Sequence, residues 1–463
     1  MIVLNIDCLL SIFNKLLLTD ERRTNKKSLL INKILPQQKS LHKSLHSCLL
    51  VNKNWCHLVV PILWKYSFYE YDKKCNNSET KKKLFSVILS CLSSSSKQLL
   101  FDNGIKLSSM ILLKPLLFNY INFCEFPSNE IVNDIIKSVE CKHDKRNLLE
   151  QEVYKLFISQ CKNIKELHWC TLQPLLSFPG ALTCFSQIRS LFININFVNS
   201  NDLYEMARFC KNLNVLYIVN YSQNHPAGLI SLIDAQRNLK SIILYYNTNV
   251  KKNHTELGEA LLRKNNTLEY LELGSICLIP PSFLTSFNNL KSITIYNCEK
   301  SKDEIKEFQQ YLNISEFPGL ESLNIHGLSC FKELATLIEK TKGNILQVII
   351  DDVKTVENSG MLIKSIFNNC PKIKRLFTYI EPKDFIYIKS LLTNCKNLNE
   401  IYLNSLNTFY DNDDNIGDEL LNILIEFSPK SLNYIKIDEG WKYSIETYKR
   451  FFETNCDKNL TIS

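Results

Sequence analysis

The chain has 463 residues and a formal net charge of +8, and 45% of its residues are hydrophobic. This length predicts about three compact domains of roughly 150 residues each, and the apolar content excludes wholesale disorder and a collagen-like chain. Only 11 residues are glycine, and the G-x-G-x-x-G and G-x-x-x-x-G-K-[ST] loops that most often cradle nucleotide phosphates are both missing.

The positive charge is concentrated near the N-terminus. Residues 1–100 hold 16 Lys and Arg against 6 Asp and Glu, and the rest of the chain is nearly balanced. The charge clusters in residues 21–27 and 73–83, which are rich in Asn, Ser and Thr rather than in stacking aromatics. Such segments are typical of solvated loops or of a surface for an acidic protein, so no nucleic-acid partner is expected.

The 17 cysteines are an odd number, and no two stand in C-x-x-C spacing. This pattern argues against a disulfide framework and a zinc ribbon. The apolar residues 1–18 lack a basic region and a cleavage site for secretion, and no apolar run reaches the roughly 18 residues of a membrane helix. We therefore expect a cytoplasmic or nuclear protein without a membrane partner.

Residues 1–66 show a helical apolar pattern that a polar insert interrupts at 18–42. The periodicity predicts a small helical domain. Its key apolar positions are Leu4, Ile6, Leu9, Leu10, Ile12, Phe13, Leu16, Leu49, Val51, Trp55, Leu63 and Trp64.

Residues 67–160 are predicted to be a linker with spacer helices. These helices would cover the first unit of the repeat array described next, because the ends of such an array need a cover. Polar composition predicts linkers at 73–83 and 93–96, and apolar periodicity predicts helices over 84–92, 131–140 and 148–159.

In residues 161–463 a short phrase of the form L-x-x-L-x-L recurs about every 27 residues, inside the period of leucine-rich repeats. Its last two apolar positions share one face of a strand and point into the core, while the intervening positions point out. This pattern predicts an α/β fold, a right-handed leucine-rich-repeat solenoid of about eleven repeats. The leading apolar residues are Ile164, Ile188, Leu213, Leu239, Leu268, Leu290, Leu320, Ile345, Ile373, Leu398 and Leu432.

The segments between the phrases are predicted to be helical. A capping box at 301–304 and Ser359 mark two helix starts, and Gly343 stands where a helix end favours a left-handed residue. Four repeats carry a cysteine at one equivalent position, which we interpret as a small buried hydrophobe. These cysteines are Cys161, Cys210, Cys370 and Cys395.

The outward strand positions would form a continuous platform on the concave face of the solenoid. Aromatic residues at such positions are enriched among interface anchors, although tyrosine also suits strands without any binding role. The predicted substrate-binding residues are Tyr217, Tyr245, Tyr270, Tyr296, His326, Phe377, Tyr379, Tyr402 and Tyr434.

No motif predicts catalysis. His42 and His46 lack the glutamate of H-E-x-x-H, the acidic run 411–418 lacks the last ligand of a calcium loop, and no G-x-S-x-G elbow occurs. We expect no catalytic residue, no metal site and no cofactor.

The N-terminal residues resemble an F-box: 4–16 read LNIDCLLSIFNKL, 49–55 read LLVNKNW and 63–64 read LW. Asn5 and Asn52 stand where the family has proline and cysteine. Together with the repeats, the layout is similar to the F-box/leucine-rich-repeat proteins of fungi. The resemblance implies a non-catalytic substrate-recognition subunit of an SCF-type cullin-RING ubiquitin ligase. Its F-box would dock on a Skp-family adaptor through the key apolar positions named above, from Leu4 to Trp64, and its repeats would bind a protein substrate.

Asn5 and the insert at 18–42 also motivate an alternative. The chain would then be a leucine-rich-repeat interaction scaffold without coupling to a ligase.

Overall fold

The computed structural model describes residues 47–74, 78–108, 111, 116–161, 164–221, 226–246, 254–297, 302–406, 416–437, 441–455 and 459–462. The predicted F-box positions Leu4 to Leu16, the insert 18–42, His42, His46 and residues 411–415 lie outside these ranges. By its internal contacts the chain divides into two compact units. The first comprises residues 1–168 and 173–187, and the second comprises 169–172 and 188–463.

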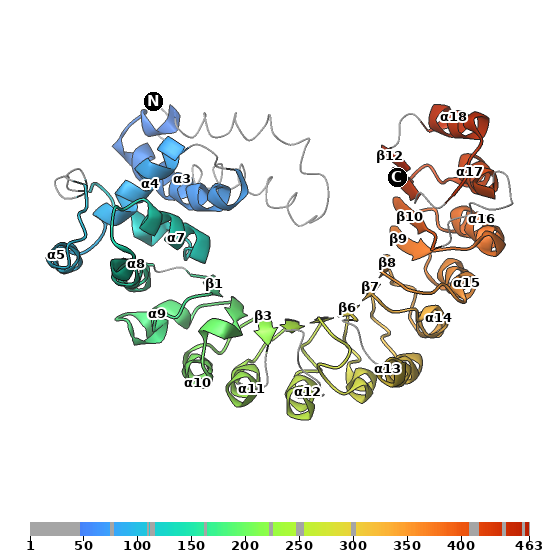
Figure 1. Ribbon diagram of the computed structural model, residues 1–463, viewed down its shortest axis with the longest axis horizontal. Helices are drawn as coiled ribbons and strands as arrows, with labels where there is room; N and C mark the ends of the chain where they lie inside the picture. Colours follow the sequence, from blue (N-terminus) through green and yellow to red (C-terminus); the bar gives the residue numbers. More distant parts are fainter. Residues whose placement is uncertain are drawn as a thin grey trace. The chain divides into compact units, whose positions relative to one another are not determined.

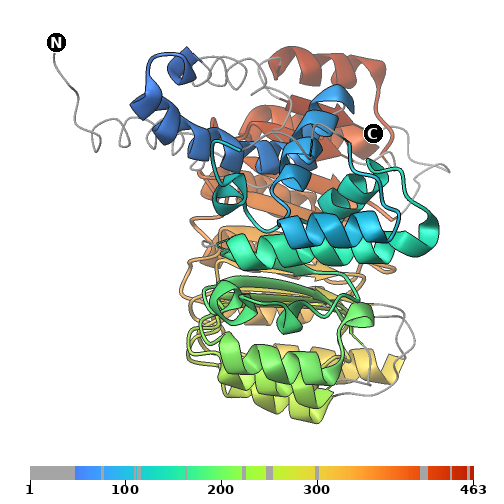
Figure 2. The same cartoon turned by 90° about the vertical axis from the view of Figure 1, so that its left-hand side faces the viewer.

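The described part of the first unit is mostly helical, and its helices are drawn in blue to green (Figure 2). Helix α8 contacts α5, α7, α9 and the 3-10 helix η2. The elements are α3 (Lys53–Lys74), α4 (Ser78–Ser90), α5 (Ser94–Asp102), η2 (Tyr120–Phe123), α7 (Asn129–Lys137), η3 (His143–Lys145), α8 (Arg146–Gln160), η4 (Leu175–Ser177) and α9 (Ala181–Phe185).

The core of this unit forms around α8. Leu149, Val153 and Leu156 recur at helical spacing and are at most 4% exposed, and further residues of α8 on other sides are buried too, as expected of a helix that lies inside a core. The Phe126 ring lies 6.3 Å from that of Phe157. The three helices predicted over 84–92, 131–140 and 148–159 are confirmed as α4, α7 and α8.

The linkers predicted in this unit were wrong where the structure describes them. Residues 78–83 form the start of α4. Ser93 is the N-cap of α5, and its side chain accepts a hydrogen bond from the backbone N–H of Ser96 at 3.0 Å. Serine is disfavoured inside helices but preferred at N-caps because its oxygen satisfies a free backbone N–H. Composition alone therefore mistook a helix start for a linker.

The second unit is built on a parallel sheet, in which neighbours along the chain are neighbours in the sheet. Strand β1 (Glu166–Trp169) comes first in the strand order, and the division between the units passes through it. The other strands are β2 (Ser190–Asn194), β3 (Val215–Tyr221), β4 (Ser241–Tyr246), β5 (Tyr270–Leu273), β6 (Ser292–Tyr296), β7 (Ser322–His326), β8 (Gln347–Asp351), β9 (Arg375–Tyr379), β10 (Glu400–Asn404), β11 (Tyr434–Ile437) and β12 (Asn459–Ile462).

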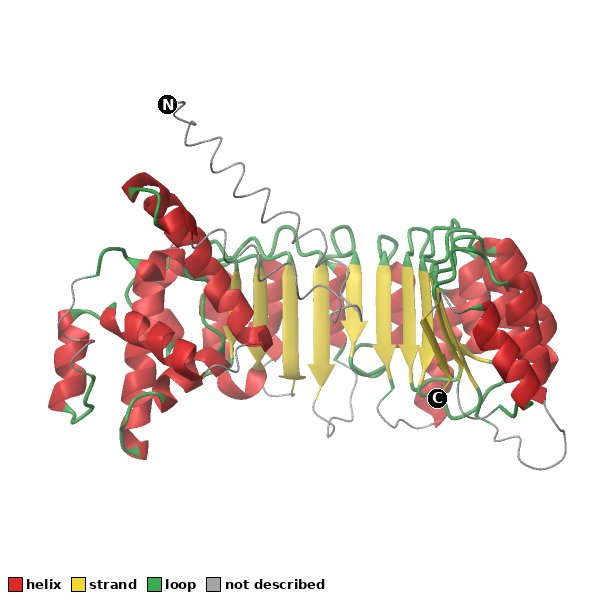
Figure 3. Ribbon diagram, turned by 90° about the horizontal axis from the view of Figure 1, so that it is seen from above, coloured by secondary structure: helices red, strands yellow, loops and turns green. Residues whose placement is uncertain are grey.

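Helices connect successive strands and cover one face of the sheet, so that the strands lie side by side in front of them (Figures 1 and 3). These elements are η5 (Ile195–Phe197), α10 (Ser200–Phe209), α11 (Pro226–Ala235), α12 (Thr255–Leu262), η6 (Pro281–Ser286), α13 (Lys302–Ile314), α14 (Phe331–Glu339), α15 (Ser359–Asn369), η7 (Pro382–Asp384), α16 (Phe385–Asn394), α17 (Ile416–Phe427) and α18 (Ile445–Thr454).

The repeat phrase forms the core between strands and helices. Each of the eleven leading apolar residues named above is at most 1% exposed, and each strand from β2 to β11 follows one of them. Strand, turn and returning helix cannot bury their apolar faces alone, so the repeats are stable when stacked. The second unit is thus an α/β solenoid of the leucine-rich-repeat type, as predicted.

The recurring cysteines lie at helix ends. Cys210, Cys370 and Cys395 are the C-caps of α10, α15 and α16, and all three are fully buried. Burial raises the pKa of the Cys210 thiol to about 11, because the charged thiolate is disfavoured away from water. Gly343 has the predicted left-handed backbone, with φ 71°.

Candidate protein-binding face

We define the strand face as the side of the sheet that faces away from the helices. Along β2, β7 and β10, buried and partly exposed residues alternate, and the parallel register aligns the outward positions of the strands into rows. On β6 the outward Thr294 is itself buried. The central row runs across ten strands, with one residue on each strand from β2 to β11. It consists of Phe192, Tyr217, Ile243, Glu272, Thr294, Asn324, Ile349, Phe377, Tyr402 and Lys436.

Aromatic rings gather on this face in two groups. The first, the N-terminal stack, extends from β2 to β7, and its members are all partly exposed. It consists of Phe192, Tyr217, Tyr245, Tyr296 and His326. Successive ring centroids are 4.7, 5.7, 5.7 and 4.5 Å apart, which are the separations of interacting aromatic pairs.

The rings of Tyr245 and Tyr296 approach each other over β5, a strand that contributes no ring to the stack. They belong to β4 and β6, two strands apart, which corresponds to about 10 Å at the usual strand spacing. Their ring centroids are nevertheless only 5.7 Å apart, so the rings lean toward each other over β5. Gly274, just after β5, permits this, because a Cβ there would lie 3.0 Å from Tyr245 Cδ1.

Glu272 of β5 belongs to the central row, two residues before Gly274. The hydroxyl of Tyr245 donates a hydrogen bond to Glu272 Oε1. Burial first, and then this hydrogen bond, raise the pKa of Tyr245 above its usual value, because the phenolate would be desolvated next to a carboxylate. Within the described part of the chain, no Lys or Arg forms an ion pair with Glu272.

His326, at the end of the N-terminal stack, is the remaining candidate for a cation near Glu272. Its ring lies parallel to that of Tyr296, at an angle of 9°. Burial lowers the pKa of His326 below its usual value, against the opposing effect of Asp351 and Glu272. Burial therefore works against a positive charge on this imidazole.

A second carboxylate three residues earlier is fully paired. Glu269 receives Lys240 Nζ at 3.2 Å on Oε1 and Lys291 Nζ at 2.8 Å on Oε2. The hydrogen bond from Lys291 is the largest cause that lowers the pKa of Glu269. Glu269 and Glu272 thus differ in that only Glu269 has cationic partners.

The C-terminal stack consists of Phe377, Tyr402 and Tyr434 on β9, β10 and β11. The ring of Tyr402 lies 3.7 Å from that of Phe377 and 5.1 Å from that of Tyr434. Lys436 Nζ lies over the Tyr402 ring, 6.0 Å from its centroid, at the outer limit of a cation–π contact. This stack therefore has a cation of its own.

An ion pair accompanies the C-terminal stack. Arg375 Nη2 donates to Glu400 Oε1 at 2.9 Å, and the two residues are direct register partners on β9 and β10.

A group of polar side chains lies on β6, β7 and β8. Asn324 donates to Thr294 Oγ1 at 2.9 Å and accepts from Gln347 Nε2 at 2.9 Å. These bonds run across β6, β7 and β8, so the side chains satisfy one another.

The structure brings most of the predicted binding residues together. Tyr217, Tyr245, Tyr296 and His326 belong to the N-terminal stack, and Phe377, Tyr402 and Tyr434 form the C-terminal stack. Tyr270 lies outside both and is 45% exposed. Tyr379 is only 8% exposed, so it offers little surface to a partner, contrary to its predicted exposure.

Sequence reasoning missed Glu272, Gly274 and Arg375. The alternation that selected the tyrosines also indicates that Glu272 and Arg375 lie on the strand face. They were missed because the prediction considered mainly aromatic residues at these positions. Gly274 had no comparable signal, because its importance depends on how two distant rings lean.

The described part of the predicted adaptor site lies at the start of α3. Leu63 is 8% exposed and forms a small cluster with Val59, against which Leu49 and Trp55 pack. Val51 is 56% exposed, and so is suited to contact a partner.

Trp64 has partners inside the first unit. Its Nε1 donates to Cys124 Sγ at 2.9 Å, and its ring lies 4.6 Å from that of Tyr120. These contacts attach α3 to η2.

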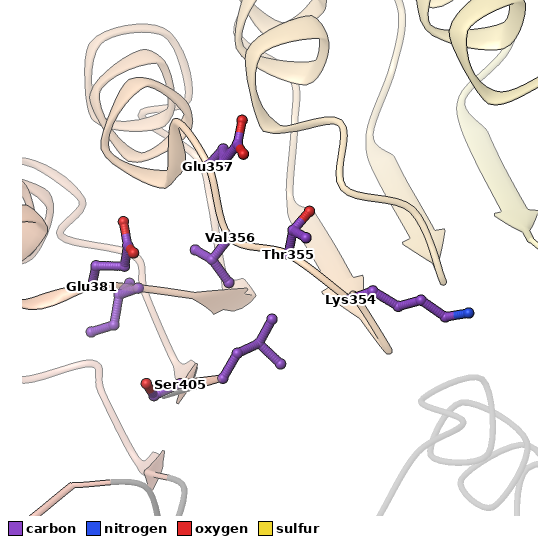
Figure 4. A pocket seen from close by; sticks show the side chains of 8 residues that line it. Lys354, Thr355, Val356, Glu357, Glu381 and Ser405 are labelled. Carbon is purple, nitrogen blue, oxygen red and sulfur yellow. The ribbon is translucent and has the colours of Figure 1, made fainter. Parts of the chain in front are cut away.

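A shallow cavity of about 340 Å³ lies among the loops that follow β8, β9 and β10. Its polar groups do not converge, since Lys354 points away from Glu357 and Glu381 (Figure 4). It is lined by Lys354, Thr355, Val356, Glu357, Ile380, Glu381, Ser405 and Leu406.

Over the described ranges, no group of three or more His, Cys, Asp and Glu side chains is arranged to hold a metal ion. No single described helix is long and apolar enough to cross a membrane. Only the bent pair Lys81–Ser90 and Ser94–Asp102, whose axes differ by 106°, matches a span in length and composition.

The sequence matches no family model and no curated protein. Among solved structures, the chain is similar to the leucine-rich-repeat-containing protein LegL7 from Legionella pneumophila. That match has 17% identity and a TM-score of 0.33, and it covers 66% of this chain and 95% of that one. The chain is also similar to a structure of the Rad7 and Elc1 complex in yeast, with 14% identity, a TM-score of 0.40, and coverage of 88% and 92%. At TM-scores below 0.5, neither likeness bears on function.

Proposed function

We propose that this chain is a substrate-recognition subunit of an SCF-type cullin-RING E3 ubiquitin ligase. Its F-box would dock on a Skp-family adaptor, and its strand face would bind a protein substrate. The observation that carries the proposal is the partly exposed aromatic surface of the solenoid, in a chain whose residues 4–64 resemble an F-box. Aromatic side chains provide large contact area at low entropic cost and dominate binding energy in many interfaces.

The described end of the F-box-like segment supports docking by apolar contact. Leu50 and Val51 are 88% and 56% exposed, directly before α3. Asn52 fixes the start of this helix, because its Oδ1 accepts a hydrogen bond from the backbone N–H of Trp55 at 2.9 Å. The two exposed side chains are therefore presented from a defined helix start.

In this role the chain is not an enzyme and needs no cofactor. Its mechanism is proximity: it holds a substrate near a ubiquitin-charged enzyme supplied by other subunits, and so raises the effective concentration of the reacting groups. The reducing environment of the cytoplasm or nucleus suits its free, buried thiols.

Co-purification of the full chain with a Skp-family adaptor tests this proposal. Phe13→Ala with Trp55→Ala should abolish adaptor capture. Because Trp55 packs in the α3 cluster, this variant can also disturb the fold. Leu50→Glu with Val51→Glu changes exposed residues instead, and should weaken capture by about tenfold or more.

The control is Ile445→Glu, which places one glutamate at an apolar residue of α18 that is 76% exposed. Capture should be unchanged in this variant. Absence of the adaptor from wild-type preparations, or equal capture by wild type and Leu50→Glu with Val51→Glu, would contradict the proposal.

A second candidate is an interaction scaffold without ligase coupling. The observation that favours it is Trp64, an expected adaptor contact whose indole N–H is directed to Cys124. A preparation that binds protein partners but never the adaptor would select this candidate.

A further inference from the structure

The N-terminal stack combines aromatic rings with the carboxylate of Glu272, and no Lys or Arg of the described residues forms an ion pair with this carboxylate. Glu272 accepts one hydrogen bond, from Tyr245, while its Oε2 has no hydrogen-bond donor among the described residues. Tyr245 and Tyr296 lean together over its strand. Ring faces carry negative charge density and attract cations, so all these groups favour the same kind of ligand.

We propose that the N-terminal stack binds a basic side chain, arginine by preference, from an extended segment of the protein partner. The guanidinium would stack on the rings of Tyr245 and Tyr296 and donate a hydrogen bond to Glu272 Oε2. Arginine suits this site better than lysine because its planar group stacks on aromatic rings and donates in a fixed direction. Phe192 and Tyr217 would contact the apolar neighbours of this arginine.

The charges on the strand face favour a peptide over a nucleic acid. Glu272 would repel a phosphate backbone, and the two nearby lysines, Lys240 and Lys291, are already paired with Glu269. Nucleic-acid binding needs a surface of unpaired cations. An extended peptide carries no phosphate, and it can present a cation and apolar side chains on the same side, about 7 Å apart.

The inference deepens the proposed function, because it rests on the strand face being the substrate-binding surface. It is tested without the adaptor. Random peptides displayed on phage are selected on the immobilised full-length chain, and the enriched peptide is synthesised with arginine and with citrulline, a neutral arginine of the same shape. Affinities are measured by fluorescence anisotropy.

Wild type should enrich peptides that share one arginine or lysine, and the citrulline form should bind about tenfold more weakly. Glu272→Gln should lose this discrimination, and Glu272→Lys should reverse it toward an acidic residue. Glu400→Gln is the matched control, since Glu400 is already paired with Arg375, and should retain the discrimination. Tyr245→Phe keeps the ring but removes the hydroxyl that positions Glu272, and should weaken binding about threefold.

Several outcomes would overturn the inference. They are failure to enrich basic peptides, equal binding of the arginine and citrulline forms, unchanged discrimination in Glu272→Gln with a wild-type circular dichroism spectrum, and binding of a random oligonucleotide pool in preference to peptides. Adaptor capture is read separately. If basic peptides bind at Glu272 but the adaptor does not co-purify, the ligase role fails and the peptide site stands.

Discussion

The two aromatic stacks of the strand face share a scaffold but differ in their charges. In the C-terminal stack, Lys436 lies over the ring of Tyr402, and Arg375 pairs with Glu400 on the neighbouring strand. In the N-terminal stack, Tyr245 donates a hydrogen bond to Glu272, which has no cationic partner among the described residues.

This difference shows how one repeated surface can hold two kinds of site. A carboxylate that already has an intramolecular cation gains little from a second one, because the first has neutralised its field. A carboxylate that lies next to aromatic rings and has no cationic partner remains available to a ligand. We call a stack closed when the carboxylate beside it has a cationic partner within the chain, and open when it has none. The C-terminal stack is closed and the N-terminal stack is open.

The largest expected effect comes from closing the N-terminal stack. Ile243 on β4 is the register partner of Glu272 on β5. Arg375 on β9 stands in the same relation to Glu400 on β10. Ile243→Arg should therefore supply an internal partner for Glu272 and weaken binding of the selected arginine peptide by about tenfold or more. Fluorescence anisotropy measures this change.

Ile349→Arg is the control for added charge, because Ile349 lies in the same central row on β8. It should change affinity less than threefold, an energy below about 0.7 kcal/mol. Equal losses in the two variants would show that the proposed pairing with Glu272 is wrong.

A smaller effect is expected from Gly274→Ala. The added Cβ would meet Tyr245 Cδ1 at 3.0 Å and the Leu244 carbonyl oxygen at 3.1 Å, so the ring or the backbone of Tyr245 must shift. Peptide affinity should fall by a few-fold, with a small drop in melting temperature. Gly319→Ala, whose Cβ would meet only Leu290 O at 3.9 Å, should leave binding unchanged.

Opening the C-terminal stack should have a modest effect on stability. Arg375→Met removes the partner of Glu400 in a pair that is partly exposed, with side-chain exposures of 32% and 27%. The free energy of unfolding in urea should fall by about 1 kcal/mol or less. The variant should also gain weak binding of arginine peptides, and no gain would mean that ring geometry, rather than a free carboxylate, determines binding.

The smallest effect concerns the paired Glu269. Its pKa is lowered in the folded chain by Lys291 and Lys240, so the pairing contributes stability above the ordinary glutamate pKa of about 4.3 and loses it as pH falls through the lowered value. The stability difference between wild type and Glu269→Gln should therefore shrink on acidification, as measured by urea unfolding at several pH values. A difference that does not depend on pH would contradict the pairing.

The sequence was sufficient to predict the solenoid, because the repeat phrase specifies burial directly. Leading apolar residues such as Leu213 and Leu290 are buried between the strands and the helices. The period of two along each strand then assigns the neighbouring positions to the strand face. The same rule predicted Tyr217 and Tyr402 correctly as surface residues. It was wrong for Tyr379, which follows the alternation but is buried at the end of its strand.

The arrangement of charges could not be predicted from one strand at a time. Whether Glu272 or Glu400 has a partner depends on which residue stands in register about 25 to 29 positions away, and on side-chain directions that vary between repeats. The helix start at Ser93 was not predicted for another reason. Serine-rich segments occur both in linkers and at helix N-caps, so composition does not distinguish the two.

Quantitative mass spectrometry of affinity-purified full-length chains tests the central claim, that this protein joins an adaptor to a substrate through two separate surfaces. Wild type should retain both partners. Leu50→Glu with Val51→Glu should lose the Skp-family adaptor and keep the substrate, and Glu272→Gln should keep the adaptor and lose the substrate. Loss of both partners in each variant, or of neither, would contradict the account.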